Sequence, residues 1–117
     1  MMAFDTSVLD EAVAQRRAAY EQKRQARLAE VLQLLDELAS GYGIQQAYIF
    51  GSLAQPGRFK PTSDIDIAVE QIDPRRFFEA AGQLSIRLGC EVDLVELKHC
   101  HFADKIRREG VLWTQSN

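Results

Sequence analysis

The pattern of apolar and polar residues predicts one long helix followed by a closely spaced series of strands and shorter helices. Residues 7–40 contain no proline or glycine and consist mainly of Ala, Leu, Glu, Gln, Arg and Lys, which enter helices readily. Asp, Thr and Ser at positions 5–7 can cap the start of a helix, and Gly41 and Gly43 mark its end. We therefore expect one long helix, or two nearly continuous ones, over this segment.

The two halves of this helix differ on the face that would meet a core. In the C-terminal half, apolar residues recur at helical spacing and form a stripe wide enough to pack on a sheet. In the N-terminal half, the same face is polar, so we expect this half to extend beyond the core. Its charges fit either a solvated arm, the usual role of such runs, or a functional basic face. The stripe comprises Leu28, Val31, Leu32, Leu34, Leu35 and Leu38, and the polar continuation carries Arg16, Tyr20, Lys23 and Arg27.

Downstream of the helix, short runs of alternating or apolar residues are separated by glycine and proline. The order of predicted elements is α, β, β, α, β, α, β. This order indicates an α/β (α+β) fold in which helices pack on a small mixed sheet. After the first helix, the segments are strands over 46–50 and 64–69, a helix over 73–88, a strand over 91–97, a short helix over 102–108 and an extended piece over 111–113.

The size and charge of the chain narrow the functional classes. Its 117 residues fit a single domain, 1–117, made of an N-terminal helical arm (1–40) and a core (45–113). The 14 Lys and Arg residues against 17 Asp and Glu residues give a net charge of -3, which argues against nucleic acid as a direct ligand. The cysteine pattern and the lack of a signal peptide or membrane-length apolar run predict a cytoplasmic protein that does not enter the membrane.

Three aspartates occupy predicted strand positions that favour metal binding. Residues two apart in a strand point to the same side, so Asp64 and Asp66 project together while the apolar residues between and after them face the core. Asp93 lies between two apolar residues in the next predicted strand. If the two strands are neighbours, three carboxylates converge. Such a group suits Mg²⁺, which binds carboxylates together with substrate phosphates.

A Gly-Ser pair supplies a candidate phosphate site. Gly51 and Ser52 directly follow the first predicted strand, where glycine allows a sharp turn and the exposed amides and hydroxyl can hold phosphate oxygens. A nucleoside triphosphate would then lie between this loop and the carboxylates. The arrangement predicts an in-line displacement at the α-phosphorus with pyrophosphate leaving, in which Asp64 and Asp66 bind metal ions and Asp93 completes a metal site.

Three segments together carry a recognisable signature: Phe50-Gly51-Ser52-Leu53-Ala54, Thr62-Ser63-Asp64-Ile65-Asp66-Ile67-Ala68-Val69 and Val92-Asp93-Leu94-Val95. They resemble the DNA polymerase beta superfamily of nucleotidyltransferases, and in particular its minimal prokaryotic branch, the MNT or MntA-like proteins. The resemblance implies a nucleotidyltransferase-like fold, Mg²⁺ as cofactor and ATP as substrate. It also implies an antitoxin encoded beside a HEPN-domain toxin with which it associates. Some members of the group silence the toxin by transferring AMP to one of its tyrosines.

The chain departs from the family pattern in the loop after the Gly-Ser pair. The family commonly reads Gly-Ser-x-Ala-Arg-Gly, whereas here Ala54 is followed by Gln, Pro, Gly and Arg. Arg58 and Lys60 are the candidates to replace the missing arginine, whose rigid fork of donors binds phosphate well. The residues that we assign to nucleotide binding are Gly51, Ser52, Arg58 and Ser63.

Two other functions fit the same residues. The altered loop and the long helix are compatible with a binding module that neutralises a partner by contact and has a degenerate nucleotide site. A nucleotidyltransferase subunit that modifies a small molecule is also compatible, provided that another subunit completes its acceptor pocket. A partner protein as acceptor is favoured because the chain is too short to carry an acceptor-binding domain of its own.

The remaining candidate residues are assigned structural roles. His99, Cys100 and His101, with Cys90 upstream, lack the usual spacing of zinc ligands. We expect Trp113 and Phe102 to complete the hydrophobic core, although an aromatic platform for adenine near the C-terminus is also compatible with the sequence.

Overall fold

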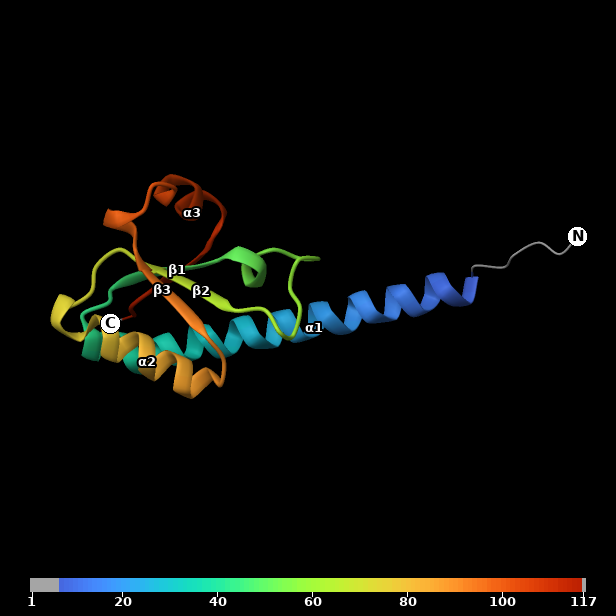
Figure 1. Cartoon of the computed structure of the whole chain (residues 1–117), viewed down its shortest axis with the longest axis horizontal. Coiled ribbons are helices and arrows are strands. Elements are labelled where there is room, and N and C mark those ends of the chain that lie inside the picture. Colours follow the sequence, from blue (N-terminus) through green and yellow to red (C-terminus); the bar gives the residue numbers. More distant parts are fainter. Residues whose placement is uncertain (1–6, 117) are drawn as a thin grey trace, which may run out of the picture.

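The computed structural model describes residues 7–116, in which the helices and strands follow the predicted order (Figure 1). The caps expected at positions 5 and 6 lie outside the described residues. The helices are α1 (Ser7–Leu38), α2 (Phe77–Leu88) and α3 (Ala103–Glu109), and the strands are β1 (Gln46–Phe50), β2 (Ile65–Val69), β3 (Val92–Glu96) and β4 (Val111–Thr114). Short 3-10 helices, η1 to η4, occupy Ala39–Tyr42, Gly51–Ala54, Pro74–Arg76 and Leu97–His99.

The strands form a four-stranded mixed sheet in the order β3-β2-β1-β4. β1 pairs antiparallel with β2 and β4, whereas β2 and β3 run parallel and are connected through α2. In the parallel pair Asp66 lies opposite Asp93, and in the antiparallel pair Asp66 lies opposite Phe50. The predicted α/β fold with a small mixed sheet is confirmed.

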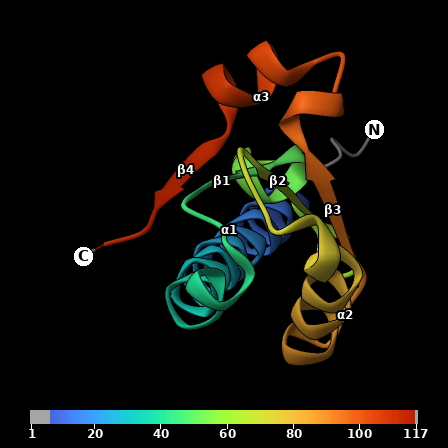
Figure 2. The same ribbon diagram turned by 90° about the vertical axis from the view of Figure 1, so that its left-hand side faces the viewer.

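Helices cover both faces of the sheet: α1 and α2 pack on one face, and α3 lies over the other (Figure 2). Ile49, Ile65 and Ile67 belong to the main core together with apolar residues of α1 and α2. Alternate strand positions point the opposite way, so Phe50 and Ala68 belong to a smaller cluster beneath α3. Polar residues at these alternate positions of β2 and β3 therefore lie on the α3 face of the sheet.

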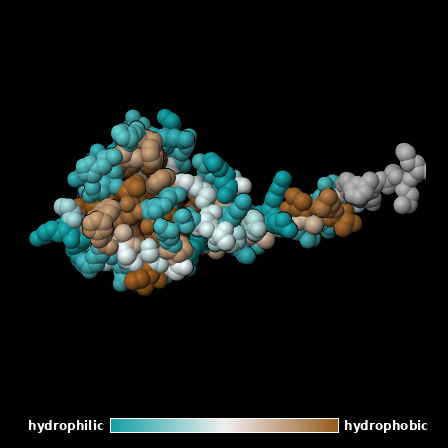
Figure 3. All heavy atoms as spheres, viewed as in Figure 1, coloured by the Kyte–Doolittle hydropathy of each residue, from teal (hydrophilic) through white to brown (hydrophobic). Residues whose placement is uncertain are grey.

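α1 is partly core helix and partly arm. Its C-terminal half buries Val31, Leu34 and Leu35, as the apolar stripe predicts. Residues 7–19 are exposed and project away from the rest of the protein, with apolar surface gathered toward the start of the helix (Figure 3). No helix within residues 7–116, α1 included, combines the length and apolar character needed to span a membrane.

α1 contains a buried cation, Arg24, that the apolar stripe and its polar continuation do not include. Arg24 is only 8% exposed, and its Nη1 donates a hydrogen bond to the carbonyl oxygen of Leu53 at 3.0 Å. Its Nε and Nη2 donate to both carboxylate oxygens of Glu21, at 2.8 and 2.6 Å. Arg16 and Lys23, which the sequence places on the polar continuation of the stripe, are exposed. Arg24 therefore ties α1 to η2, the turn that follows β1.

The two aromatic residues expected in the core differ in outcome. Trp113 is buried, and its Nε1 donates a hydrogen bond to Oδ1 of Asp36 at 2.8 Å. Phe102 is 54% exposed, so the prediction that it completes the core is wrong. It precedes the first turn of α3, and Ile106 is the residue of that helix that fills the cluster against the sheet.

Candidate active site

Asp66 and Asp93 form a side-by-side pair of carboxylates on the α3 face of the sheet. They are register partners at the second positions of β2 and β3. Asp66 is half-buried, and this burial, the charge and hydrogen bond of Asp93 and the charge of Asp64 together raise the pKa of Asp66 to about 6. Ionising both carboxylates is therefore unfavourable unless a cation lies beside them, which is a common property of functional sites.

Asp64 stands apart from this pair. β2 begins at Ile65, one residue later than predicted, so Asp64 lies in the preceding loop and is exposed. Its charge contributes to the raised pKa of Asp66, so the two groups are neighbours. Within residues 7–116, no three His, Cys, Asp or Glu side chains are arranged so that they could hold a metal ion by themselves. The assignment of all three aspartates as metal ligands stays a prediction.

Gly51 brings the backbone of η2 against the carboxylate of Asp66. Its φ of 74° lies in the left-handed region, and a Cβ added there would fall 2.3 Å from Oδ2 of Asp66. A residue with a side chain would thus meet both backbone strain and a direct clash. The sequence predicted a sharp turn and a close approach to a ligand at this glycine. The structure shows the turn, with the carboxylate directly beside it.

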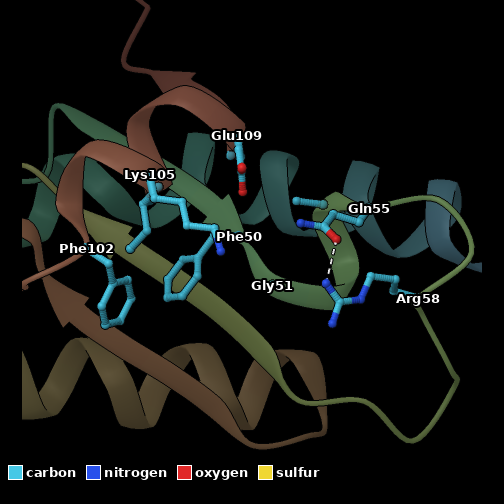
Figure 4. A pocket seen from close by; sticks show the side chains of 10 residues that line it. Phe50, Gly51, Gln55, Arg58, Phe102, Lys105 and Glu109 are labelled. Atoms are coloured by element: carbon cyan, nitrogen blue, oxygen red, sulfur yellow. Dashed lines mark hydrogen bonds between the residues drawn. The ribbon is translucent and has the colours of Figure 1, made fainter.

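A pocket opens next to Gly51, between η2 and α3 (Figure 4). It has a volume of about 190 Å³, and Phe50, Phe102 and Ile106 give part of its wall an apolar character. The exposed ring of Phe102 and the ring of Phe50 face this space, which explains why an aromatic residue is tolerated outside the core. The lining residues are Phe50, Gly51, Ala54, Gln55, Arg58, Phe102, Lys105, Ile106, Glu109 and Gly110.

The residues predicted to bind nucleotide are only partly gathered at this pocket. Gly51 and Arg58 line it, whereas Ser52 is half-buried in η2 and does not. Ser63 lies in the loop before β2, where its Oγ accepts a hydrogen bond from the backbone N–H of Lys60 at 3.0 Å. Ser63 and Lys60 thus close a turn of the loop and are not part of the pocket wall.

The contribution of α3 to this site was not predicted. Phe102, Lys105, Ile106 and Glu109 all line the pocket. Their spacing of three, one and three residues places them on one face of a helix. That periodicity was readable in the sequence, but nothing in the sequence showed that this short helix packs above the end of β1.

A model of the family described as "Polymerase beta, Nucleotidyltransferase" matches residues 19–117 of the chain. The chain belongs to the polymerase beta nucleotidyltransferase family. The match begins within α1, so the second half of the long helix is part of the family domain, although the signature segments of the sequence begin only at Phe50. As a nucleotidyltransferase, the protein has its carboxylate pair and glycine turn within the matched region.

Solved structures with a similar fold come from toxin–antitoxin proteins. The toxin–antitoxin MntA-HpeT mutant is 28% identical with a TM-score of 0.56, over 73% of this chain and 72% of that chain. A toxin–antitoxin structure with AMP-PNP is 26% identical with a TM-score of 0.55, over 79% of this chain and 73% of that chain. The toxin–antitoxin MntA-HepT has the same identity and coverage and a TM-score of 0.53. None of the curated proteins compared with this nucleotidyltransferase is significantly similar to it.

Proposed function

We propose that this nucleotidyltransferase is the antitoxin of a HEPN–MNT pair and transfers AMP from ATP to its partner protein in a Mg²⁺-dependent reaction. The observation that carries the proposal is the Asp66–Asp93 pair on the α3 face, in contact with Gly51 at the edge of a pocket. The similarity to toxin–antitoxin structures, one of them with AMP-PNP, supports the choice of partner and nucleotide.

The carboxylate pair fits a divalent cation. Mg²⁺ prefers oxygen ligands and is usually held by one or two carboxylates, with waters and substrate phosphates completing its shell. Asp66 and Asp93, with Asp64 nearby, supply such ligands. Burial and then the charge of Asp93 raise the pKa of Asp66, and a cation beside the pair would offset both effects. When bound, Mg²⁺ would neutralise the phosphates and help to stabilise the charge that develops during an in-line displacement.

The remaining roles are assigned from the sequence signature, and of these residues Gly51 and Arg58 line the pocket. In our proposal Gly51 and Ser52 present backbone and hydroxyl donors to the phosphates, Arg58 supplies a cation, and Ser63 shapes the loop that carries Asp64. A hydroxyl oxygen of the acceptor forms a bond to the α-phosphorus, the bond from that phosphorus to the bridging oxygen of the β-phosphate breaks, and pyrophosphate leaves. The acceptor proton passes to Asp93 or to water.

The acceptor belongs to another protein in this proposal. We take residues 1–117 as one domain in which 45–113 form the catalytic core and 1–40 form the arm. The exposed half of α1 projects away from the core and carries none of the proposed site residues (Figure 1). By analogy with the HEPN–MNT group, the acceptor is a tyrosine of a HEPN-domain toxin, the two proteins associate, and both act in the cytoplasm.

One observation favours a second candidate, an antitoxin that acts by contact alone. The start of α1 exposes Val8, Leu9 and Val13 on the part of the helix that projects away from the core (Figure 3). Such a surface suits a partner, because contiguous exposed apolar residues commonly mark interaction sites. Contact alone would neutralise a toxin without any transfer.

A labelling experiment separates the two candidates. The purified chain is incubated with Mg²⁺ and α-labelled ATP, alone and with a HEPN-domain protein encoded beside it, and label on protein is read by gel and mass spectrometry. We expect label on the partner, and its loss in Asp66→Asn and Asp93→Asn. A tight complex that neutralises the toxin without label, and does so equally well with both variants, would establish the contact mechanism.

A further inference from the structure

Two cationic side chains reach the pocket from different elements. Arg58 belongs to the loop after η2, and Lys105 belongs to α3. In Figure 4, Lys105 extends from α3 toward Phe50, while Arg58 approaches from the loop on the other side of Gly51. The pocket is therefore flanked by positive charge from both of its walls, with the backbone of Gly51 between them.

Neither cation forms an ion pair with a carboxylate in the described part of the chain. Within residues 7–116, the side chain of Lys105 has no hydrogen bond or ion pair, and the side-chain partner of Arg58 is the uncharged Gln55. The next cation along α3 differs, because Arg107 pairs with Glu70 at 2.8 Å and with Asp104 at 3.4 Å. Unpaired cations that converge on one cavity favour an anionic ligand.

Gln55 explains how Arg58 reaches the pocket despite its shifted place in the sequence. The family pattern has an arginine directly after the alanine, where this chain has Gln55. The Oε1 of Gln55 accepts a hydrogen bond from Nη1 of Arg58 at 2.9 Å, and both residues line the pocket. The amide thus holds the guanidinium beside the position that the arginine would occupy. Because this partner carries no charge, the positive charge of Arg58 is left for a ligand.

The pocket also adjoins the carboxylate pair. Gly51 lines the pocket on one side and lies against the carboxylate of Asp66 on the other. An anion between Arg58 and Lys105 would thus sit next to the place where we put Mg²⁺. A polyphosphate bound to a divalent cation needs this combination of cations on one side and carboxylates on the other.

We propose that Lys105 is a nucleotide-binding residue that forms, with the Gln55-positioned Arg58, a two-cation clamp on the polyphosphate chain of the substrate. The clamp rests on the proposed nucleotidyltransferase function and adds α3 to the nucleotide site. Lys105 contributes a flexible point charge and Arg58 a planar fork of donors, so the two contact different oxygens of an extended chain. Glu109, one turn further along α3, weakens the positive field at the rim and makes the clamp sensitive to its charge.

The test compares binding of three probes to the full chain by calorimetry: ATP with Mg²⁺, inorganic tripolyphosphate, and adenosine. Lys105→Ala is expected to weaken binding of ATP and tripolyphosphate about tenfold or more, since a charge-assisted hydrogen bond is lost, and to leave binding of adenosine unchanged. Lys105→Arg should restore most of the affinity. Glu109→Gln should increase the affinity for tripolyphosphate, because it removes a negative charge from the pocket.

Arg108→Ala is the matched control, because Arg108 is exposed on the same helix, carries the same charge and does not line the pocket. It should leave all three affinities unchanged, and thermal unfolding of both alanine variants should match the wild type.

The outcomes also distinguish this inference from the proposed function. If the wild type binds ATP and Lys105→Ala binds it equally well, the clamp is wrong while the nucleotidyltransferase function stands. The clamp is also overturned if Arg108→Ala has the same effect, or if Lys105→Ala weakens adenosine binding as strongly as ATP binding, which would make the pocket a site for the base. Clamp-dependent binding of tripolyphosphate without any transfer of label would support the clamp and count against the proposed function.

Discussion

The α-carbon of Gly51 lies directly against the carboxylate of Asp66, so closely that an added Cβ would fall 2.3 Å from Oδ2. Gly51 begins η2 and Asp66 lies in β2, and this contact joins the turn that we propose to bind phosphate to the carboxylate pair. The two halves of the proposed site can thus lie in contact because Gly51 has no side chain.

Gly51→Ala should therefore damage both stability and nucleotide binding. The left-handed backbone of Gly51 costs an alanine about 1–2 kcal/mol, and the clash with Asp66 adds to this because the carboxylate must move. Urea unfolding and ATP titration measure the two effects. Gly57→Ala is the matched control, since Gly57 has a φ of 85° but no atom within 4 Å of the added Cβ. Equal losses in the two variants would show that the contact with Asp66 is unimportant.

Asp66→Asn should change how stability depends on pH. Because the pKa of Asp66 is raised from 3.8 to about 6 in the folded state, the folded protein binds this proton more tightly than the unfolded chain does. The associated stability is fully present below the unfolded pKa and is lost as the pH rises through about 6. At pH 7 and without Mg²⁺, the variant should be more stable than the wild type by about 1 kcal/mol, allowing for solvent screening of this half-exposed group.

The measurement is urea unfolding at pH values from 4 to 8, with and without Mg²⁺. Added Mg²⁺ should raise the stability of the wild type at pH 7 more than that of Asp66→Asn. Parallel curves for the two proteins across this range would contradict the raised pKa.

Shortening the core-facing side chains of β2 and β3, the strands that carry Asp66 and Asp93, should destabilise the fold. Ile65 and Leu94 are buried neighbours of Asp66 and Asp93 along β2 and β3. Substituting either residue by alanine should lower the free energy of unfolding by about 2–5 kcal/mol. Ile86→Ala, on the 76% exposed side chain of α2, should change stability by less than about 0.5 kcal/mol. Thermal unfolding of all three variants tests this assignment of strand faces, which would be wrong if Ile65→Ala behaved like Ile86→Ala.

Arg24→Ala should loosen the turn that carries Ser52. The substitution removes the hydrogen bond to the carbonyl of Leu53. Because the donor is charged and buried, we expect the free energy of unfolding to fall by about 1.5–3 kcal/mol. Amide hydrogen exchange in η2 should become faster as well. Lys23→Ala, at the exposed neighbouring position, should change neither quantity. Unaltered exchange in η2 of Arg24→Ala would mean that the turn is held by its own backbone.

Much of the fold was predictable because the sequence is locally consistent. The proline-free start, the strands with alternating burial and the glycine stops each specify one kind of element. The pairing of Asp66 with Asp93 was predicted only on the condition that β2 and β3 are neighbours. The sheet order that meets this condition depends on long-range packing, which periodicity does not encode.

The positions of Arg24 and Phe102 were not predictable from the sequence, and the physical reason is the same for both. Arg24 is charged and would ordinarily be placed on a solvated face, yet a single backbone carbonyl and Glu21 satisfy it where α1 crosses η2. Phe102 is aromatic and would ordinarily be placed in a core, yet it lines a pocket. In both cases composition favours the common outcome, and only the positions of distant segments reveal the exception.

The proposed site of this protein depends on the register in which β3 pairs with β2. Asp66 and Asp93 face the same side because the segment between them brings Val92 level with Ile65. A slip of β3 by one residue against β2 would turn Asp93 toward the main core and bring a valine or leucine to the site, although every aspartate would still be present in the sequence. Homologues should therefore keep apolar residues on both sides of each paired aspartate, because burial of those neighbours holds the register that brings the two carboxylates together.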